Sequence, residues 1–355
     1  MEEVEHGWVM PPEWARQDAV WLSWPVDDPR HWGGAKREVV WRKFAEIVAV
    51  ISRFEPVRIN SVDGLAGWLP ARVREHGGEP ARVELFDHAH NDVWCRDHGP
   101  IFVKKQRSGE LAVTDWGFNG WGGRFAPWDL DDAIPKQVAA ALGMRLIDGG
   151  MILEGGAIEV NGAGQLLTTE AVLLNRNRNP EMGRKEVEER LREVLGVREV
   201  LWLERGIEGD DTGGHVDDLA RFVNDTTIVA AVDQEAGSPN DLVLKGNLQR
   251  LRGFRTPDDR PFDVVELPMP EACEVPGWRL PVLPATYVNF LIVNGGVLVP
   301  TFRQEKNDDR ALGMMRELFP GREVVGVDCL ELVEEGGSLH CISRQQPGSE
   351  GWSLS

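Results

Sequence analysis

Cys341, in the run Gly336-Gly337-Ser338-Leu339-His340-Cys341-Ile342-Ser343, is the residue whose type and setting best suit a nucleophile. Three further motifs with acidic or histidine side chains lie far upstream: Trp94-Cys95-Arg96-Asp97, Glu154-Gly155-Gly156 and Gly214-His215-Val216-Asp217-Asp218. A cysteine nucleophile needs its thiolate, an acid–base partner within hydrogen-bond reach and a group that orients this partner. His215 can serve as the partner because histidine titrates near neutral pH, and Glu154 can orient it.

Two carboxylates, Asp97 and Asp217, remain for binding a substrate. Carboxylates bind a planar guanidinium group through paired, charge-assisted hydrogen bonds. Attack of the thiolate on the central guanidinium carbon, with His215 protonating the leaving amine, would release ammonia and leave a covalent thiouronium. Water would then convert this intermediate into a ureido product. If the segment around His215 is extended, residues 215 and 217 project from the same face.

A metal site is the competing interpretation of the polar residues near Asp97. His88, His90, Cys95 and His98 are suitable ligand types, but their spacing matches no structural zinc motif, and we expect no metal. If Cys341 lies on a strand, His340 points to the opposite face, so we expect His340 to be structural.

Composition and charge limit the classes of partner. The chain has 355 residues and a net charge of −19, which argues against a nucleic-acid-binding protein and weakly favours a cationic small molecule. Four cysteines without close pairing predict a reducing compartment. The acidic N-terminal residues do not form a signal peptide, and residues 287–302 are too interrupted by polar residues and glycine to span a bilayer. We therefore expect a cytoplasmic protein.

The chain repeats one unit, in which a helix and a strand precede a motif and one or two further strands. The expected helix and strand pairs are 65–75 with 82–86, 131–142 with 144–147, 181–195 with 199–203, 242–252 with 263–267, and 308–318 with 323–327. The strands expected after the motifs are 101–103, 157–160, 165–168, 219–223, 227–232, 287–293 and 297–299.

Five such units predict a single α/β domain over residues 1–355, arranged as a closed or stacked array. Each motif falls at the same point of its unit. Closure around a common axis would therefore bring together Asp97, Glu154, His215, the strand that contains Asn289, and Cys341.

These motifs together resemble the agmatine deiminase and bacterial peptidyl-arginine deiminase family of the guanidino-group-modifying superfamily. The resemblance runs nearly end to end, through Met10-Pro11-Pro12-Glu13-Trp14, residues 91–100, Leu153-Glu154-Gly155-Gly156, residues 175–180, residues 214–218 and residues 339–347. It implies a five-bladed α/β propeller, the pentein fold, with the active site on its axis. It also implies Cys341 as nucleophile, His215 as general acid and base aided by Glu154, and no metal or organic cofactor. The residues that it implies bind substrate are Asp97, Asp217, Trp94 and Asp211.

The chain differs from the family pattern at positions beside the expected site. Asp211 replaces the glutamate that contacts the far amine of agmatine, and Glu335 replaces the first glycine of the C-terminal motif. Ser338 and Leu339 are the other differences in that motif.

The resemblance implies hydrolysis of agmatine to N-carbamoylputrescine and ammonia, a reaction of putrescine and polyamine biosynthesis. A peptidyl- or free-arginine deiminase, an amidinotransferase and a non-catalytic propeller are the alternatives. Free arginine would need a cation for its carboxylate, for which Arg96, Arg221 and Arg303 are candidates. Residues 116–128, rich in glycine and tryptophan, are a candidate lid, and the sequence leaves open whether the chain forms a homo-oligomer.

Overall fold

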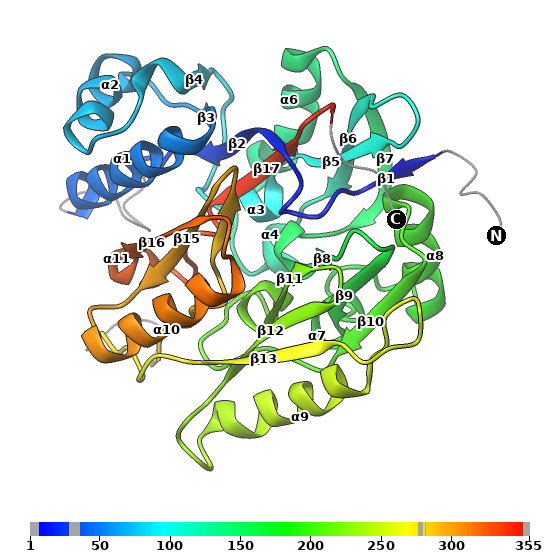
Figure 1. Ribbon diagram of the computed structural model, residues 1–355. Coiled ribbons are helices and arrows are strands. Elements are labelled where there is room, and N and C mark those ends of the chain that lie inside the picture. The colour runs from blue at the N-terminus through cyan, green and yellow to red at the C-terminus, as the bar shows by residue number, and fades with distance from the viewer. Residues whose placement is uncertain (1–6, 28–35, 276–279, 281, 351–355) are drawn as a thin grey trace.

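The computed structural model describes residues 7–27, 36–275, 280 and 282–350. Within this part of the chain the strands form five separate sheets (Figure 1). In spatial order these are β17 (Ser343–Pro347), β2 (Gln17–Ser23), β3 (Val57–Asn60) and β4 (Val83–Phe86); β1 (Trp8–Val9), β5 (Ile101–Lys105), β6 (Leu111–Gly117) and β7 (Arg145–Ile152); β10 (Glu199–Leu203), β9 (Gln165–Thr169) and β8 (Glu159–Val160); β11 (Ala220–Asn224), β12 (Thr227–Val232) and β13 (Asp263–Pro268); and β14 (Leu291–Val293), β15 (Gly296–Thr301) and β16 (Glu323–Asp328).

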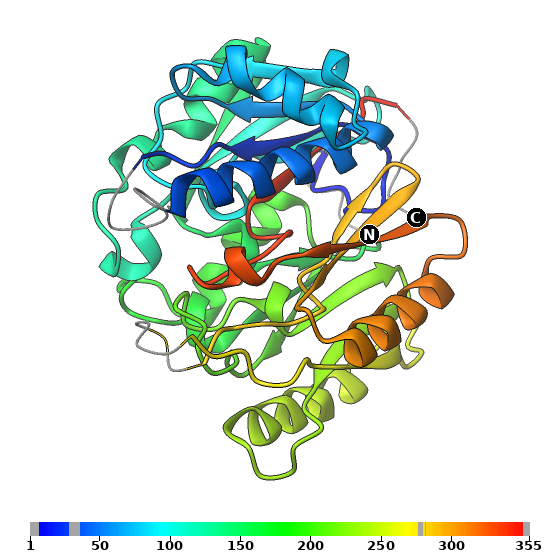
Figure 2. The same ribbon diagram turned by 90° about the vertical axis from the view of Figure 1, so that its left-hand side faces the viewer.

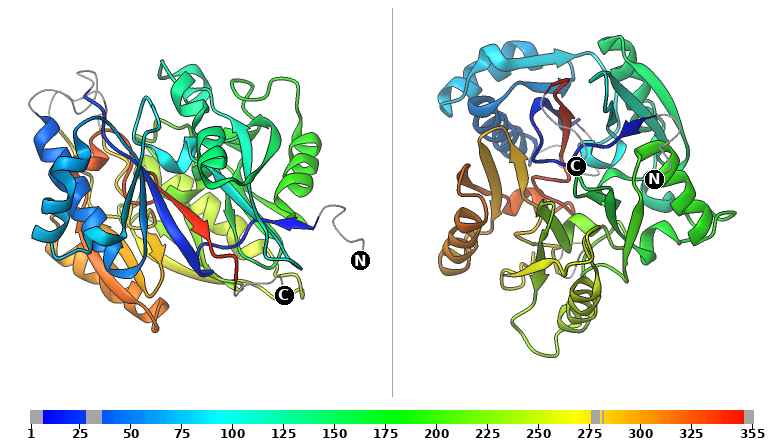
Figure 3. Two further views of the ribbon diagram at one scale, coloured as in Figure 1. Left: turned by 90° about the horizontal axis from the view of Figure 1, so that it is seen from above. Right: turned by 45° about the vertical axis from the view of Figure 1, so that its right-hand side comes forward.

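The five sheets share one connection pattern. In each, a strand pairs antiparallel with the next strand of the unit, which then pairs parallel with a third strand after a helical crossover. In the sheet formed by the two ends of the chain, β17 is the antiparallel partner of β2, with Ser343 opposite Leu22. The C-terminal strand thus completes the sheet that the N-terminal residues begin, as the red and blue strands show in Figure 3.

The helices of the crossovers lie on the outside of the molecule (Figure 3, right). The α-helices are α1 (Arg37–Phe54), α2 (Leu65–Glu75), α3 (Cys95–His98), α4 (Gly120–Gly123), α5 (Asp129–Asp132), α6 (Ile134–Leu142), α7 (Glu170–Leu173), α8 (Arg184–Leu195), α9 (Pro239–Gly253), α10 (Glu305–Leu318) and α11 (Leu330–Val333). Short 3₁₀ helices are η2 (Pro80–Arg82), η3 (Gly155–Ala157) and η4 (Val216–Asp218). The long helices α1, α9 and α10 are seen clearly in Figure 2.

Local sequence explains where these helices begin and end. Helix α9 begins after Ser238, whose hydroxyl accepts a hydrogen bond from the Asp241 N–H at 3.0 Å, and Pro239 occupies its first turn. Helix α8 ends at Gly196, which adopts φ 68°, a conformation that costs glycine little. The mixed α/β class and the repeated units predicted from the sequence are therefore present in the described residues.

Three predicted elements differ from those observed. The expected helix 131–142 is divided into α5 and α6, and Pro135 lies at the start of the second of these. Helix α8 begins at Arg184 and not at residue 181, because Gly183 and Glu186 form its cap. The expected strand 287–293 is shortened to β14, since residues 286–290 form a turn that leads into it.

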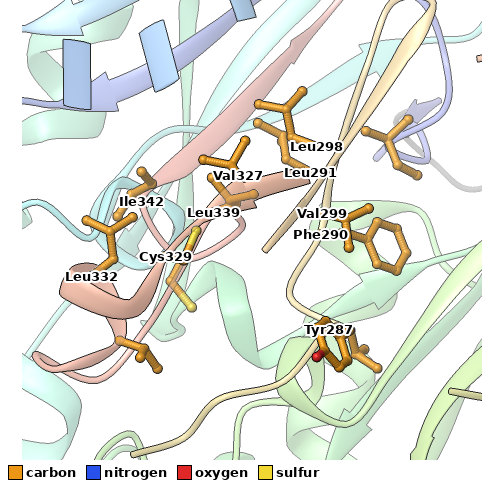
Figure 4. Close-up of a cluster of buried hydrophobic side chains, with 14 of the residues drawn as sticks. Tyr287, Phe290, Leu291, Leu298, Val299, Val327, Cys329, Leu332, Leu339 and Ile342 are labelled. Atoms are coloured by element: carbon orange, nitrogen blue, oxygen red, sulfur yellow. The ribbon is translucent and has the colours of Figure 1, made fainter. Parts of the chain in front are cut away.

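Apolar packing fixes the turn that carries Cys341. Leu339 and Ile342, on either side of His340 and Cys341, are fully buried. They lie among Leu332, Cys329 and Val327, as Figure 4 shows, in a cluster that also includes side chains of β14 and β15. Because apolar residues flank the turn, its position is determined by the core and not by the solvent.

Candidate active site

The motif segments occupy equivalent places in the five units. Helix α3 precedes β5, η3 precedes β8, η4 precedes β11, residues 286–290 precede β14, and the turn of residues 339–342 precedes β17. Helix α3 contacts η3, and η3 contacts η4. The repeat therefore brings to one place side chains that are up to several hundred residues apart in sequence.

Gly156 marks the point at which three of the predicted side chains meet. A Cβ atom at this position would lie 2.6 Å from His215 Nδ1, 2.7 Å from Asp97 Oδ1 and 3.1 Å from Asp217 Oδ2. The Gly156 N–H itself donates a hydrogen bond to Asp97 Oδ1 at 2.9 Å. Glycine is required here because any side chain would collide with all three groups.

The thiol of Cys341 lies beside this cluster and is almost fully buried, with 5% of its surface exposed. Asn289 Nδ2 donates to Cys341 Sγ at 3.1 Å, and Asp217 Oδ2 lies 3.9 Å from the sulfur. Burial, followed by the negative charges of Asp217, Asp218 and Asp97, raises the pKa of this thiol well above its usual range. A bound cation that offsets these charges would lower it again.

His215 is held between two carboxylates. Its Nδ1 lies 3.5 Å from Asp97 Oδ1 and its Nε2 lies 3.9 Å from Glu154 Oε2, distances of ion pairs and not of short hydrogen bonds. Burial lowers the pKa of the imidazole, but Asp97, Glu154 and Asp217 outweigh it and raise this pKa to about 10. The imidazole is therefore a cation at neutral pH and can donate a proton.

The predicted extended conformation around His215 is wrong. Residues 216–218 form the 3₁₀ helix η4, and His215 is the extended residue that precedes it. Its N–H donates to Asp210 Oδ2 at 3.0 Å, which anchors the loop. His215 and Asp217 nevertheless meet at Gly156, because a 3₁₀ turn can also bring side chains two residues apart to one side.

Glu154 is fixed by an arginine from a neighbouring loop. Arg178 Nε donates to Glu154 Oε1 at 2.9 Å, and Arg178 Nη2 donates to the Thr212 carbonyl at 2.7 Å. Burial raises the pKa of Glu154, but His215 and Arg178 outweigh it and lower this pKa below its usual value. Glu154 therefore remains a carboxylate that can hold His215 in place.

Asp97 and Asp217 have different surroundings. Asp97 Oδ2 accepts a hydrogen bond from Trp121 Nε1 at 2.9 Å. Burial is the largest influence on Asp97, and despite the opposing effect of His215 its pKa is raised to about 6. Burial also acts on Asp217, but His340, whose Nδ1 lies 2.6 Å from Asp217 Oδ2, outweighs it and lowers the pKa.

His340 takes part in the site, contrary to the expectation that it would point away from Cys341. Cys341 lies in a turn and not on a strand, so the alternation of faces does not apply. His340 Nε2 lies 2.7 Å from Glu13 Oε2, and Arg221 Nη2 lies 3.0 Å from the same oxygen. The chain of contacts from Asp217 through His340 to Glu13 and Arg221 fixes Asp217 from behind.

Asn289 and Asp218 are further residues of the site that had no predicted role. Asn289 Nδ2 donates to Asp218 Oδ1 at 3.0 Å as well as to Cys341 Sγ. Asn289 Oδ1 accepts from the Cys341 N–H at 3.3 Å and from Ser338 Oγ at 2.9 Å. Burial, then Asp217 and Asp210, raise the pKa of Asp218 well above its usual value, so Asp218 is expected to be protonated.

A narrow cavity of about 30 Å³ leads to the thiol. Its described lining includes Trp94 and Asp211, both expected from the sequence to contact substrate, together with Asp92, Asp97, Trp121, Phe125, Thr212, Glu335, Gly336 and Cys341. Trp121 and Phe125 belong to the candidate lid of residues 116–128, and both form part of the wall. This segment therefore covers the site in the present structure.

The three arginines considered for binding a substrate carboxylate have other partners. Arg96 and Arg221 are buried and form ion pairs with Glu13 at 3.3 and 3.0 Å. Arg303 pairs with Asp328 at 2.8 Å on the surface. Among the described residues that line the cavity, none is a lysine or an arginine.

The histidines of the candidate metal site are held by other groups. His88 Nδ1 lies 2.9 Å from Asn60 Oδ1, His90 Nε2 lies 2.7 Å from the Trp24 carbonyl, and His98 Nε2 lies 2.9 Å from Ser23 Oγ. Within residues 7–350 as described, the group whose ligand atoms lie within 4.8 Å of one another is Asp217, Asp218 and Cys341. There the amide of Asn289 donates to both Asp218 and Cys341, so a hydrogen-bond donor occupies the place of a cation.

Comparison with known proteins identifies the class to which this fold and site belong. The model of the Porphyromonas-type peptidyl-arginine deiminase family matches residues 9–347. The chain belongs to this family, which confirms the family predicted from the motifs.

Particular relatives narrow the comparison. The agmatine deiminase of Pseudomonas fluorescens is 36% identical over 97% of this chain and 96% of its own length. The structure of the agmatine deiminase of Enterococcus faecalis superposes with a TM-score of 0.89 at 31% identity, over 98% of each chain. A Porphyromonas gingivalis structure, provisionally assigned as an arginine deiminase, has 40% identity and a TM-score of 0.85 over 96% of this chain and 98% of its own. No helix among the described residues is both long and apolar enough to cross a membrane.

Replacement of Gly156 by alanine is expected to disturb the site more than the fold. The added methyl group would displace Asp97, His215 or Asp217, and a shift of about 1 Å in such groups can lower kcat by roughly a hundredfold. The free energy of unfolding should fall by about 1–3 kcal/mol. Steady-state kinetics and thermal unfolding would test this, with Gly313→Ala in α10, where the methyl group meets nothing within 4 Å, as the control. Equal activity of the two variants would contradict the geometry.

Proposed function

We propose that the chain is an agmatine deiminase, which hydrolyses agmatine to N-carbamoylputrescine and ammonia in putrescine biosynthesis. The observation that carries this proposal is the charge of the cavity. Its described lining holds four carboxylates, from Asp92, Asp97, Asp211 and Glu335, and no basic side chain. Agmatine, unlike arginine, has no carboxylate and carries a positive charge at each end. The agmatine deiminases among the relatives support the same substrate.

The first step in the proposed mechanism joins the sulfur of Cys341 to the guanidinium carbon. Asp97 and Asp217 would bind the guanidinium nitrogens, which places the carbon beside the thiol. The positive charge of the substrate offsets the carboxylates that raise the pKa of Cys341, so binding favours the thiolate. His215 then donates its proton to the leaving amine, ammonia departs, and a thiouronium remains attached to the sulfur.

The second step returns the enzyme to its starting state. Neutral His215 takes a proton from water, and the resulting hydroxide attacks the thiouronium carbon. The carbon–sulfur bond then breaks, the thiolate leaves, and the ureido oxygen loses its remaining proton to the released ammonia. Glu154 supports both steps because it holds His215 while the imidazole alternates between its charged and neutral forms. This mechanism requires no cofactor.

The architecture proposed for this function is one catalytic domain. We propose that the five sheets are the blades of a five-bladed α/β propeller, the pentein fold, which closes where β17 joins β2. The five motif segments would then face a common axis, in agreement with their contacts near Gly156. The chemistry needs a free thiol at Cys341, which favours the reducing, cytoplasmic location expected from the sequence.

A substrate panel tests the proposal directly. The wild-type protein should release ammonia and a ureido product from agmatine, and much less from arginine or glycylarginine, because the cavity offers no cation for a carboxylate. Faster reaction with arginine or with the peptide would contradict the assignment to agmatine. Product that forms only when an acceptor amine is added would instead identify an amidinotransferase.

The pH dependence of kcat/KM should show two limits. Asp97 binds guanidinium only as a carboxylate, so kcat/KM should decrease as the pH falls through about 6. His215 donates a proton only as a cation, so kcat/KM should also decrease as the pH rises through about 10. A pH profile of the wild type and of Asp97→Asn would test this. The account is wrong on Asp97 if the acidic limit is the same in both proteins.

A further inference from the structure

Glu335 is a buried acidic residue that the mechanism above does not use. It has 7% of its surface exposed and lines the cavity that contains Cys341. Its N–H donates to the Leu332 carbonyl at 3.1 Å, directly after α11, so its backbone is fixed by the end of that helix. Gly337, two residues further on, packs closely against the Trp94 ring and Cys341. Glu335 therefore lies on a wall whose position relative to the thiol is well determined.

The carboxylates of the cavity fall into two groups. Asp97 is bound to Trp121, Gly156 and His215 at the catalytic cluster. Asp211 and Glu335 line the cavity but lie outside this cluster, on segments that come from different sheets. A substrate whose guanidinium group lies at Cys341 and Asp97 thus extends through a space with further negative charge.

The two differences from the family pattern lie in the same cavity. Asp211 is one methylene shorter than the glutamate of that pattern, and Glu335 adds a carboxylate where the pattern has glycine. On the basis of the proposed function, we propose that Glu335, together with Asp211, binds the distal ammonium group of the substrate. Glu335 is then the residue that makes this chain select a guanidine with a second positive charge over a guanidine with an uncharged tail.

Two substrates of equal length separate this role from a general one. Agmatine has the distal ammonium group, whereas an alkylguanidine with the same four-carbon chain lacks it. In Glu335→Gln, kcat/KM for agmatine should fall roughly tenfold to a hundredfold, the range for loss of one charged hydrogen bond. The value for the alkylguanidine should stay unchanged. The control is Glu334→Gln, because the neighbouring Glu334 pairs with Lys36 at 2.5 Å and does not line the cavity.

Binding measurements make the comparison independent of turnover. Calorimetric titration of Cys341→Ser, with and without Glu335→Gln, should show weaker binding of agmatine and unchanged binding of the alkylguanidine. Glu335→Asp, which keeps the charge, should give an intermediate loss and serves as a second variant if Glu335→Gln folds poorly. Equal losses for both ligands, or no loss for agmatine, would overturn the role of Glu335. A wild-type protein that acts on neither compound would instead overturn the proposed function and, with it, this inference.

Discussion

The Cys341→Ser variant is expected to lose at least roughly 10⁴-fold in kcat, the scale seen when a nucleophile is removed from a catalytic group that acts as a unit. The serine hydroxyl can keep the hydrogen bond with Asn289 but is a much poorer nucleophile than the thiolate. Since the substitution changes little in volume, the melting temperature should stay close to that of the wild type. Agmatine should still bind, because Asp97 and Asp217 remain.

Cys273→Ser is the matched control for this prediction. Cys273 is also buried, and its thiol donates to the Glu271 carbonyl at 3.6 Å, an interaction that serine can replace. This control should keep near-native activity. Steady-state ammonia release, thermal unfolding and calorimetric binding of agmatine would be measured for both variants. Near-native turnover by Cys341→Ser would remove the basis of the proposed mechanism.

Replacement of Asp217 by asparagine is expected to lower kcat/KM roughly 10²- to 10³-fold. Asp217 contributes a buried negative charge 3.9 Å from the sulfur, and removing one member of a buried charge pair typically costs about 2–5 kcal/mol. His340 would also lose the carboxylate that lies 2.6 Å from its Nδ1. Asp97→Asn should show a loss of similar size, because Asp97 is the second expected partner of the guanidinium group.

Asp218→Asn is the matched control for charge at this position. The pKa of Asp218 is raised well above its usual value, so it is expected to be neutral already, and asparagine can still accept the hydrogen bond from Asn289. We therefore expect a much smaller loss than for Asp217→Asn when kcat/KM for agmatine is compared. Equal losses for the two variants would show that the charge of Asp217 is not what matters.

Strands with clear patterns were predictable from the sequence. β10 and β12 have the expected bounds, because each is a short run of apolar and β-branched residues beside a turn or a charged flank. Residues 287–290 were expected to extend β14, since Tyr287, Val288 and Phe290 continue the apolar pattern. They instead form the turn that places Asn289 beside Cys341, and a polar residue inside an apolar run was the available signal.

The site was predictable in its members but not in its connections. Cys341, His215, Glu154, Asp97 and Asp217 are brought together as the repeat predicted, and Trp94 and Asp211 line the same cavity. The role of Glu13 could not be found from spacing, because its contact with His340 joins the two ends of the chain. That contact exists only once β17 pairs with β2, and sequence patterns within one unit do not report it.

The most direct test of the account is mass spectrometry of the protein quenched with acid during turnover of agmatine. The account predicts a thiouronium adduct on the peptide that contains residue 341, formed within the first turnover and absent from Cys341→Ser. Continued product formation with an unmodified sulfur at this position, or an adduct on a different residue, would contradict it.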